Sequence, residues 1–129
     1  MSATPEEFEK FWSGCLKAIA ETATTLEGDN IPELSMQTDT SVIEKALGSH
    51  GERVRNEAHE FLSVNRNLLG DSDLELAGAC FQYERNGSER GFWNSGWPEN
   101  GEELGEIAQA FGPCGLVKLE DGKFDVLEM

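Results

Sequence analysis

The first part of the chain carries one continuous apolar stripe at helical spacing, and this constrains the start of the fold more than any other feature. Apolar side chains recur at three- and four-residue steps from Phe8 to Leu26, which is the spacing of one face of an α-helix. The segment 4–7 before the stripe has the order of a capping box with proline at the first helical position. Gly28 is placed to end the helix in a left-handed conformation. We therefore predict a long amphipathic helix that buries its stripe.

A second helical region is expected after a loop over residues 29–40, where Pro32 bars continuation of the helix. Ser41 and Glu44 have the spacing of another capping box, and apolar residues then follow at helical steps. Glycines interrupt this pattern. The sequence thus predicts a second helix that is broken near residues 48–51.

The spacing of apolar residues changes after this region, and two hairpins are expected around a third helix. Residues 76–84 and 88–94 flank an Asn-Gly pair, which is typical of a tight hairpin turn. Residues 116–120 and 123–127 flank an Asp-Gly pair in the same way. A two-residue loop in this last hairpin would place Val117 opposite Val126.

These elements indicate an α+β fold in a single domain over residues 1–129. The expected order is two N-terminal helical segments, then hairpin, helix and hairpin. We expect the hairpins to form a four-stranded antiparallel sheet covered by helices. No apolar run approaches the roughly 20 residues that span a bilayer, and the acidic N-terminus does not resemble a signal peptide, so no membrane partner is expected.

The chain is strongly acidic, with 25 acidic and 10 basic residues and a formal net charge of −15. If the 15 net negative charges were spread evenly over the folded surface, neighbouring charges would stand about 20 Å apart. This spacing exceeds the roughly 8 Å screening length of physiological salt. Only a local cluster of carboxylates would therefore produce a strong field. Residues 71–129 carry the larger share of the excess, with thirteen acids and four bases.

The clearest cluster lies at the third predicted helix. Its four carboxylates occupy positions i, i+3, i+4 and i+7, so they share one helix face without an intervening base: Glu99, Glu102, Glu103 and Glu106. Such a face can present negative charge to a basic groove, as a phosphate backbone does. Alternatively, acids in a first helical turn only complement the helix dipole on a solvated face. The acids of the last hairpin extend the cluster if that hairpin packs alongside.

Two tryptophans, Trp93 and Trp97, flank a loop immediately before these carboxylates. Tryptophan is enriched among the residues that dominate binding energy at interfaces, so an exposed Trp97 beside a charged helix would form a docking site. The competing interpretation is that both rings pack on the sheet or under the third helix.

Catalysis and metal binding receive little support. The three cysteines, Cys15, Cys80 and Cys114, are odd in number and widely separated, which favours idle thiols in a reducing cytoplasm over a disulfide framework. Cys114 beside a histidine is the one enzyme arrangement worth noting, although no nucleophile signature surrounds it. Paired ligand spacing for zinc is absent, and no cofactor is expected.

The sequence therefore favours a non-enzymatic cytoplasmic protein that docks on a basic protein partner, such as a nucleic-acid-binding protein or a nuclease. Phage antagonists of restriction or CRISPR systems and immunity proteins against nuclease toxins share this size and charge, and they act as nucleic-acid mimics or inhibitors. Nucleic acid itself is disfavoured as a ligand, because the glutamates repel phosphate. The alternatives are a chaperone-like or dimeric interaction protein with an apolar or aromatic surface, and an enzyme of unrecognised type. Monomer and homodimer both remain open.

Overall fold

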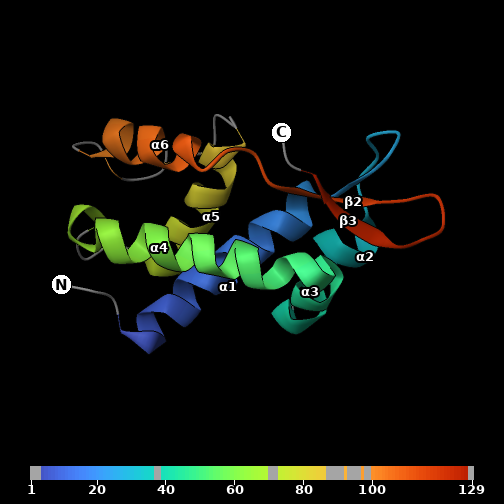
Figure 1. Cartoon of the computed structure of the whole chain (residues 1–129), viewed down its shortest axis with the longest axis horizontal. Coiled ribbons are helices and arrows are strands. Elements are labelled where there is room, and N and C mark those ends of the chain that lie inside the picture. The colour runs from blue at the N-terminus through green and yellow to red at the C-terminus, as the bar shows by residue number, and fades with distance from the viewer. Residues whose placement is uncertain are drawn as a thin grey trace.

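A computed structural model describes residues 4–36, 39–69, 73–86, 92, 97 and 100–127. The acidic helix α6 and the small sheet lie toward opposite ends of the molecule, with α1 and α4 running between them (Figure 1). The elements in chain order are α1 (Pro5–Thr22), β1 (Thr24–Thr25), α2 (Pro32–Ser35), α3 (Thr40–Leu47), η1 (Gly48–His50), α4 (Gly51–Leu69), α5 (Leu74–Arg85), α6 (Gly101–Ala110), β2 (Gly115–Lys118) and β3 (Phe124–Leu127).

Helix α1 begins where the sequence predicts and ends earlier than expected. The Thr4 hydroxyl accepts the Glu7 amide at 3.2 Å and the Glu7 carboxylate accepts the Thr4 amide at 2.9 Å, which confirms the capping box. The helix stops at Thr22, because the β-branched threonines that follow favour an extended chain. Leu26 is consequently 55% exposed, and Gly28, with φ +91°, lies in the turn after β1 instead of ending α1.

The broken second helix is confirmed, with differences at its start. Gly48 has φ +58° and opens the 3₁₀ turn η1 between α3 and α4. The N-cap of α3 is Asp39, whose carboxylate accepts the Ser41 amide at 3.0 Å, so Ser41 is not the cap. The expected loop over residues 29–40 also contains the short helix α2. Pro32 stands at the first position of that helix, where its missing N–H costs nothing.

Residues 74–85 form helix α5, so the prediction of a strand over residues 76–84 is wrong. Asp73 caps the helix and accepts the amides of Glu75 and Leu76 at 3.0 and 3.3 Å. Nine of the twelve residues are buried, so the helix has no polar face and shows no helical period in its sequence. Of the expected partner strand over 88–94, only Phe92 lies among the described residues.

The sheet has three strands in the order β1–β2–β3 and is mixed, so the prediction of a four-stranded antiparallel sheet is wrong. β1 pairs with β2 in parallel through Thr24 and Val117, and β2 pairs with β3 in antiparallel orientation. Helix α5 replaces the first expected hairpin. The two threonines directly after α1 supply the third strand instead. The fold remains α+β.

The C-terminal hairpin is confirmed, but its register differs by one residue from the prediction. Leu116 lies opposite Val126, and the Leu119 amide donates to the Lys123 carbonyl at 2.7 Å. The loop therefore has three residues and not two. Gly122 takes φ +85° in this loop, as the glycine of a three-residue hairpin loop does.

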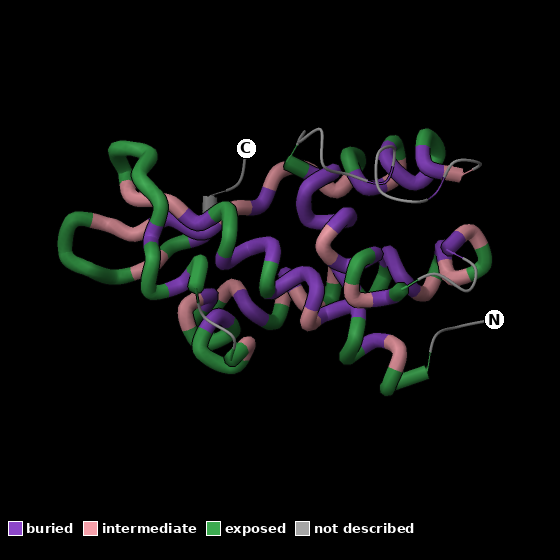
Figure 2. The backbone as a smooth tube through the Cα atoms, turned by 180° about the vertical axis from the view of Figure 1, so that it is seen from behind, coloured by how far each residue is buried: buried purple, intermediate pink, exposed green. Residues whose placement is uncertain are grey.

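The core is an aromatic cluster enclosed by the helices. Ring centroids lie 5.8 Å apart between Phe11 and Phe81, 4.4 Å between Phe61 and Phe81, and 5.6 Å between Phe61 and Phe92. The rings come from α1, α4, α5 and the segment before α6, so they join the long helices to the end that carries α6. The buried stretches of the chain gather between the helices, while exposed stretches lie at turns and outer faces (Figure 2).

Candidate functional site

Helix α6 presents three of the four predicted carboxylates to solvent. Glu102, Glu103 and Glu106 are exposed, while Leu104 and Ala108 are buried on the opposite side. We call Glu102, Glu103 and Glu106 the acidic face. Their exposure follows from the three- and four-residue steps between them, as the sequence indicates. The fourth carboxylate, Glu99, lies outside the described residues.

The acidic face is not neutralised by ion pairs within the part of the chain that the structure describes. Most of the described lysines and arginines are engaged with carboxylates elsewhere. Lys17 pairs with Glu75. The remaining pairs are Arg53–Glu57 at 3.8 Å, Arg55–Glu9 at 2.5 Å, Arg66–Glu7 at 2.6 Å, Arg85–Glu57 at 2.9 Å and Lys118–Glu33 at 2.7 Å. The three α6 carboxylates are therefore exposed to solvent without a partner cation among the described residues.

Trp97 is buried, with 6% of its surface exposed, and is not an accessible docking residue. Its ring packs edge-on against Phe92 with the centroids 5.2 Å apart, and its Nε1–H donates to the Leu69 carbonyl at 3.3 Å. These contacts agree with the packing interpretation for Trp97, which fastens the segment before α6 to the end of α4. Trp93 lies outside the described residues.

The described acids of the last hairpin, Glu120, Asp121 and Asp125, do not extend the acidic face, and Glu128 lies outside the described residues. The hairpin lies at the end of the molecule away from the first turn of α6 (Figure 1). Asp125 instead approaches the His50 Nε2 at 3.1 Å. The acidic face is therefore a local feature of α6 and its immediate neighbours.

The sequence patterns do not predict the groove that lies between α4 and α6. It has a volume of about 350 Å³ and is predominantly apolar, and we call it the α4–α6 groove; its lining residues are Glu60, Phe61, Val64, Asn65, Ile107, Ala110 and Phe111. One feature of the sequence is consistent with an apolar groove on α4. Val64 lies off the buried stripe of α4, which includes Phe61 and Leu62, and is 74% exposed.

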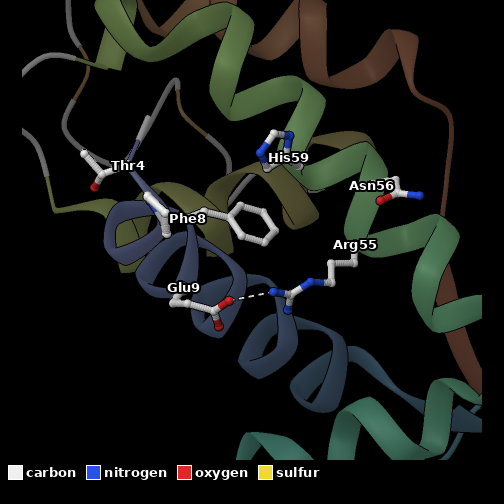
Figure 3. A pocket seen from close by; sticks show the side chains of 7 residues that line it. Thr4, Phe8, Glu9, Arg55, Asn56 and His59 are labelled. Carbon is white, nitrogen blue, oxygen red and sulfur yellow. Dashed lines mark hydrogen bonds and ion pairs between the residues drawn. The ribbon is translucent and has the colours of Figure 1, made fainter. Parts of the chain in front are cut away.

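A second pocket, of about 260 Å³, lies between α1 and α4 (Figure 3). Arg55 reaches toward Glu9 in this pocket, at 2.5 Å, and its other guanidinium nitrogen is 3.7 Å from Glu44. The guanidinium also lies 4.9 Å from the Phe8 ring centroid. His59 packs edge-on against the same ring at 5.0 Å. Because two carboxylates already balance the one cation, the pocket has no excess positive charge with which to hold an anion.

The three cysteines are buried in the core. The Cys15 Sγ–H donates to the Gly78 carbonyl at 3.3 Å, and burial raises the pKa of this thiol far above its ordinary value. Cys114 is 1% exposed, and its amide donates to the Asn86 side chain at 2.8 Å. Within the described ranges, no group of three or more His, Cys, Asp or Glu residues is arranged to hold a metal ion.

The chain was compared with protein-family models, curated proteins and solved structures, and none of them matches it. Among the described residues, no helix combines the length and apolar character needed to cross a membrane.

Proposed function

We propose that this protein is a non-enzymatic binding protein that docks on a basic protein partner through the acidic face of α6. The observation that carries the proposal is the exposure of Glu102, Glu103 and Glu106 without an ion pair among the described residues. Three carboxylates on adjacent turns of one helix hold a negative field that lysines and arginines of a partner would neutralise.

The charge distribution supports a role in binding over a role in solubility alone. Helices α1 and α4 offset much of their own charge, since Arg55 and Arg66 of α4 pair with Glu9 and Glu7 of α1. Helix α6 carries acids and no base. Acidity for solubility would need no such segregation, whereas complementary docking does. A nucleic-acid-binding protein or a nuclease is the class of partner whose basic groove fits this face.

The test measures affinity for purified partners across salt concentration. Proteins retained from a lysate of the source organism are identified, purified and titrated against the wild type and the variant E102Q/E103Q/E106Q. A matched control, E27Q/E52Q/E120Q, removes the same charge from exposed positions away from α6.

We expect the partner to be basic, its affinity to fall with salt, and the acidic-face variant to bind about tenfold more weakly or worse, while the control binds as the wild type does. Equal affinity of the wild type and the acidic-face variant would overturn the proposal. Retention of only acidic or uncharged partners would overturn it as well.

A further inference from the structure

Helices α4 and α6 run antiparallel and are fastened together at both ends. At one end the Asn100 side-chain amide donates to the Leu68 carbonyl at 3.1 Å, beside the bond from Trp97 to Leu69. At the other end the Phe61 and Phe111 rings meet edge-on with their centroids 6.1 Å apart. The α4–α6 groove lies between the two helices, and Phe61 and Phe111 are among the residues that line it.

The floor of the groove connects an exposed apolar surface with the core. Val64 is 74% exposed, Ala110 is exposed and Ile107 is half-buried, whereas Phe61 at the base is fully buried. An apolar side chain placed in the groove would remove exposed surface of Val64, Ile107 and Ala110 from water. Each Å² of apolar surface that is buried in this way favours binding by roughly 25 cal/mol.

Carboxylates border this apolar surface on both helices. Glu60 lies one helical turn before Val64, Glu103 one turn before Ile107, and Glu106 one turn before Ala110. Because the helices are antiparallel, Glu60 lies toward the Phe111 end and Glu103 toward the Leu68 end. None of the three acids forms an ion pair within the described part of the chain, and no lysine or arginine lines the groove. The groove therefore has a carboxylate near each of its two ends.

We propose that the α4–α6 groove binds an amphipathic helix of the basic partner, with two apolar side chains one turn apart in the groove and lysines or arginines over the three bordering glutamates. The lining residues of α4, Glu60 to Asn65, rise by about 8 Å, which suits two side chains spaced by one helical turn of about 5–6 Å. A helix is the element that packs along a furrow between two helices. This inference rests on the function proposed above and names the segment of the partner that is recognised.

The test uses a helix-stabilised peptide of about 15 residues, with two leucines one turn apart and flanking lysines. A scrambled peptide of the same composition removes the amphipathic face, and a glutamate-for-lysine peptide reverses the charge. Each is titrated into the protein, and the backbone and methyl resonances of Val64, Ile107 and Ala110 are followed by NMR. The groove variant V64Q/A110Q removes apolar surface at two exposed positions without changing charge. The matched control L26Q/M36Q alters exposed apolar residues elsewhere.

We expect saturable shifts at these three residues with the basic amphipathic peptide alone, and an affinity at least about fivefold lower for V64Q/A110Q, with L26Q/M36Q unchanged. The variant E102Q/E103Q/E106Q should also weaken binding and reduce its salt dependence. No saturable shift with the amphipathic peptide at about 1 mM overturns the inference.

Three further outcomes are decisive, and the first of them separates this inference from the proposed function. If the scrambled peptide binds equally and V64Q/A110Q has no effect, while the acidic-face variant still loses affinity, the groove is overturned and the acidic docking face stands. If the glutamate-for-lysine peptide binds as well as the basic one, both are overturned. Concentration-dependent shifts at the groove without peptide, together with dimers in sedimentation, would assign the groove to a second copy of the chain and also overturn the inference.

Discussion

Gly14 of α1 and Gly78 of α5 let the two helices cross with their backbones in direct contact. A Cβ on Gly14 would stand 1.8 Å from the Glu75 carbonyl oxygen, and a Cβ on Gly78 would stand 1.9 Å from the Phe11 carbonyl oxygen. The relationship is reciprocal, since each glycine faces the backbone of the other helix. The Cys15 Sγ–H bond to the Gly78 carbonyl lies at the same crossing. The position of α5 in the core depends on this approach.

Gly78→Ala should therefore destabilise the protein by about 3 kcal/mol, because the added methyl group forces the two backbones apart. Helix propensity alone would give the opposite result, because it favours alanine over glycine by roughly 1 kcal/mol inside a helix. The midpoint of urea denaturation measures the effect. Gly115→Ala is the control, since a Cβ there meets nothing within 4 Å, and it should change stability by less than about 0.5 kcal/mol. A wild-type midpoint for Gly78→Ala would contradict the close crossing.

The same crossing explains why α5 could not be predicted from the sequence. Helix α1 was recognisable because its stripe, from Phe8 onward, has polar residues on the other side. Helix α5 has neighbours on nearly all sides, so even Gln82, Glu84 and Arg85 are buried. A helix without a solvent face has no period to detect. The tertiary contacts, and not the local pattern, decide its structure.

The candidate site also has one part that the sequence predicts and one part that it does not. The acidic face was predictable, because the steps among Glu102, Glu103 and Glu106 alone place them on one helix face. The α4–α6 groove was not, because Val64 and Ile107 come together only when the two helices pack. Local spacing thus reveals which side chains share a surface of one helix. It does not reveal what a second helix adds to that surface.

The polar contacts at the end of α5 give a second prediction. Arg85, with 1% of its side chain exposed, donates to the Glu57 carboxylate at 2.9 Å and to the carbonyls of Gly112 and Phe111 at 2.8 and 3.3 Å. Arg85→Ala leaves these acceptors without their donor and should cost about 3 kcal/mol in the free energy of unfolding. Arg85→Lys should recover little of it, because a single ammonium lacks the fork of donors.

Urea denaturation of both Arg85 variants checks this, with Lys17→Ala as the comparison. The pair of Lys17 with Glu75 is about half exposed on both sides, so its loss should cost less than about 1 kcal/mol. Similar losses for Arg85→Ala and Lys17→Ala would show that burial of Arg85 adds nothing to its role. Full stability of Arg85→Lys would show that the fork geometry is not used.

A pH dependence is expected from the start of α1. The hydrogen bond from Arg66 and then the bond from the Thr4 amide lower the pKa of Glu7 below its ordinary value of 4.5. A carboxyl whose pKa is lower in the folded state stabilises the fold above the unfolded pKa, and this contribution is lost as pH falls through the folded pKa. Glu7→Gln should therefore destabilise the protein near neutral pH, and the difference from the wild type should shrink as pH falls below about 4.5.

Thermal unfolding of the wild type and Glu7→Gln between neutral and acidic pH measures this convergence. Glu6→Gln is the matched control, because it removes an exposed carboxylate from the same first turn without touching the bond to Arg66. A difference that stays constant across the pH range would contradict the role of the Glu7 charge.

The three-residue loop of the C-terminal hairpin gives the last prediction. Gly122 has φ +85°, a conformation that costs an L-residue about 1–2 kcal/mol, while nothing lies within 4 Å of a Cβ at this position. Gly122→Ala should therefore destabilise the protein by about 1 kcal/mol through backbone strain alone, and Gly122→Asn by less, because asparagine tolerates the left-handed region better. Urea denaturation measures the stability of the wild type, Gly122→Ala and Gly122→Asn.

A two-residue loop with the register predicted from the sequence would place both central residues, Asp121 and Gly122, at positive φ. Asp121 does not have positive φ. Asp121→Ala should therefore lose only the 3.0 Å bond from the Lys123 amide to its carboxylate, whereas a gain in stability for Asp121→Gly comparable to the loss for Gly122→Ala would favour the two-residue loop.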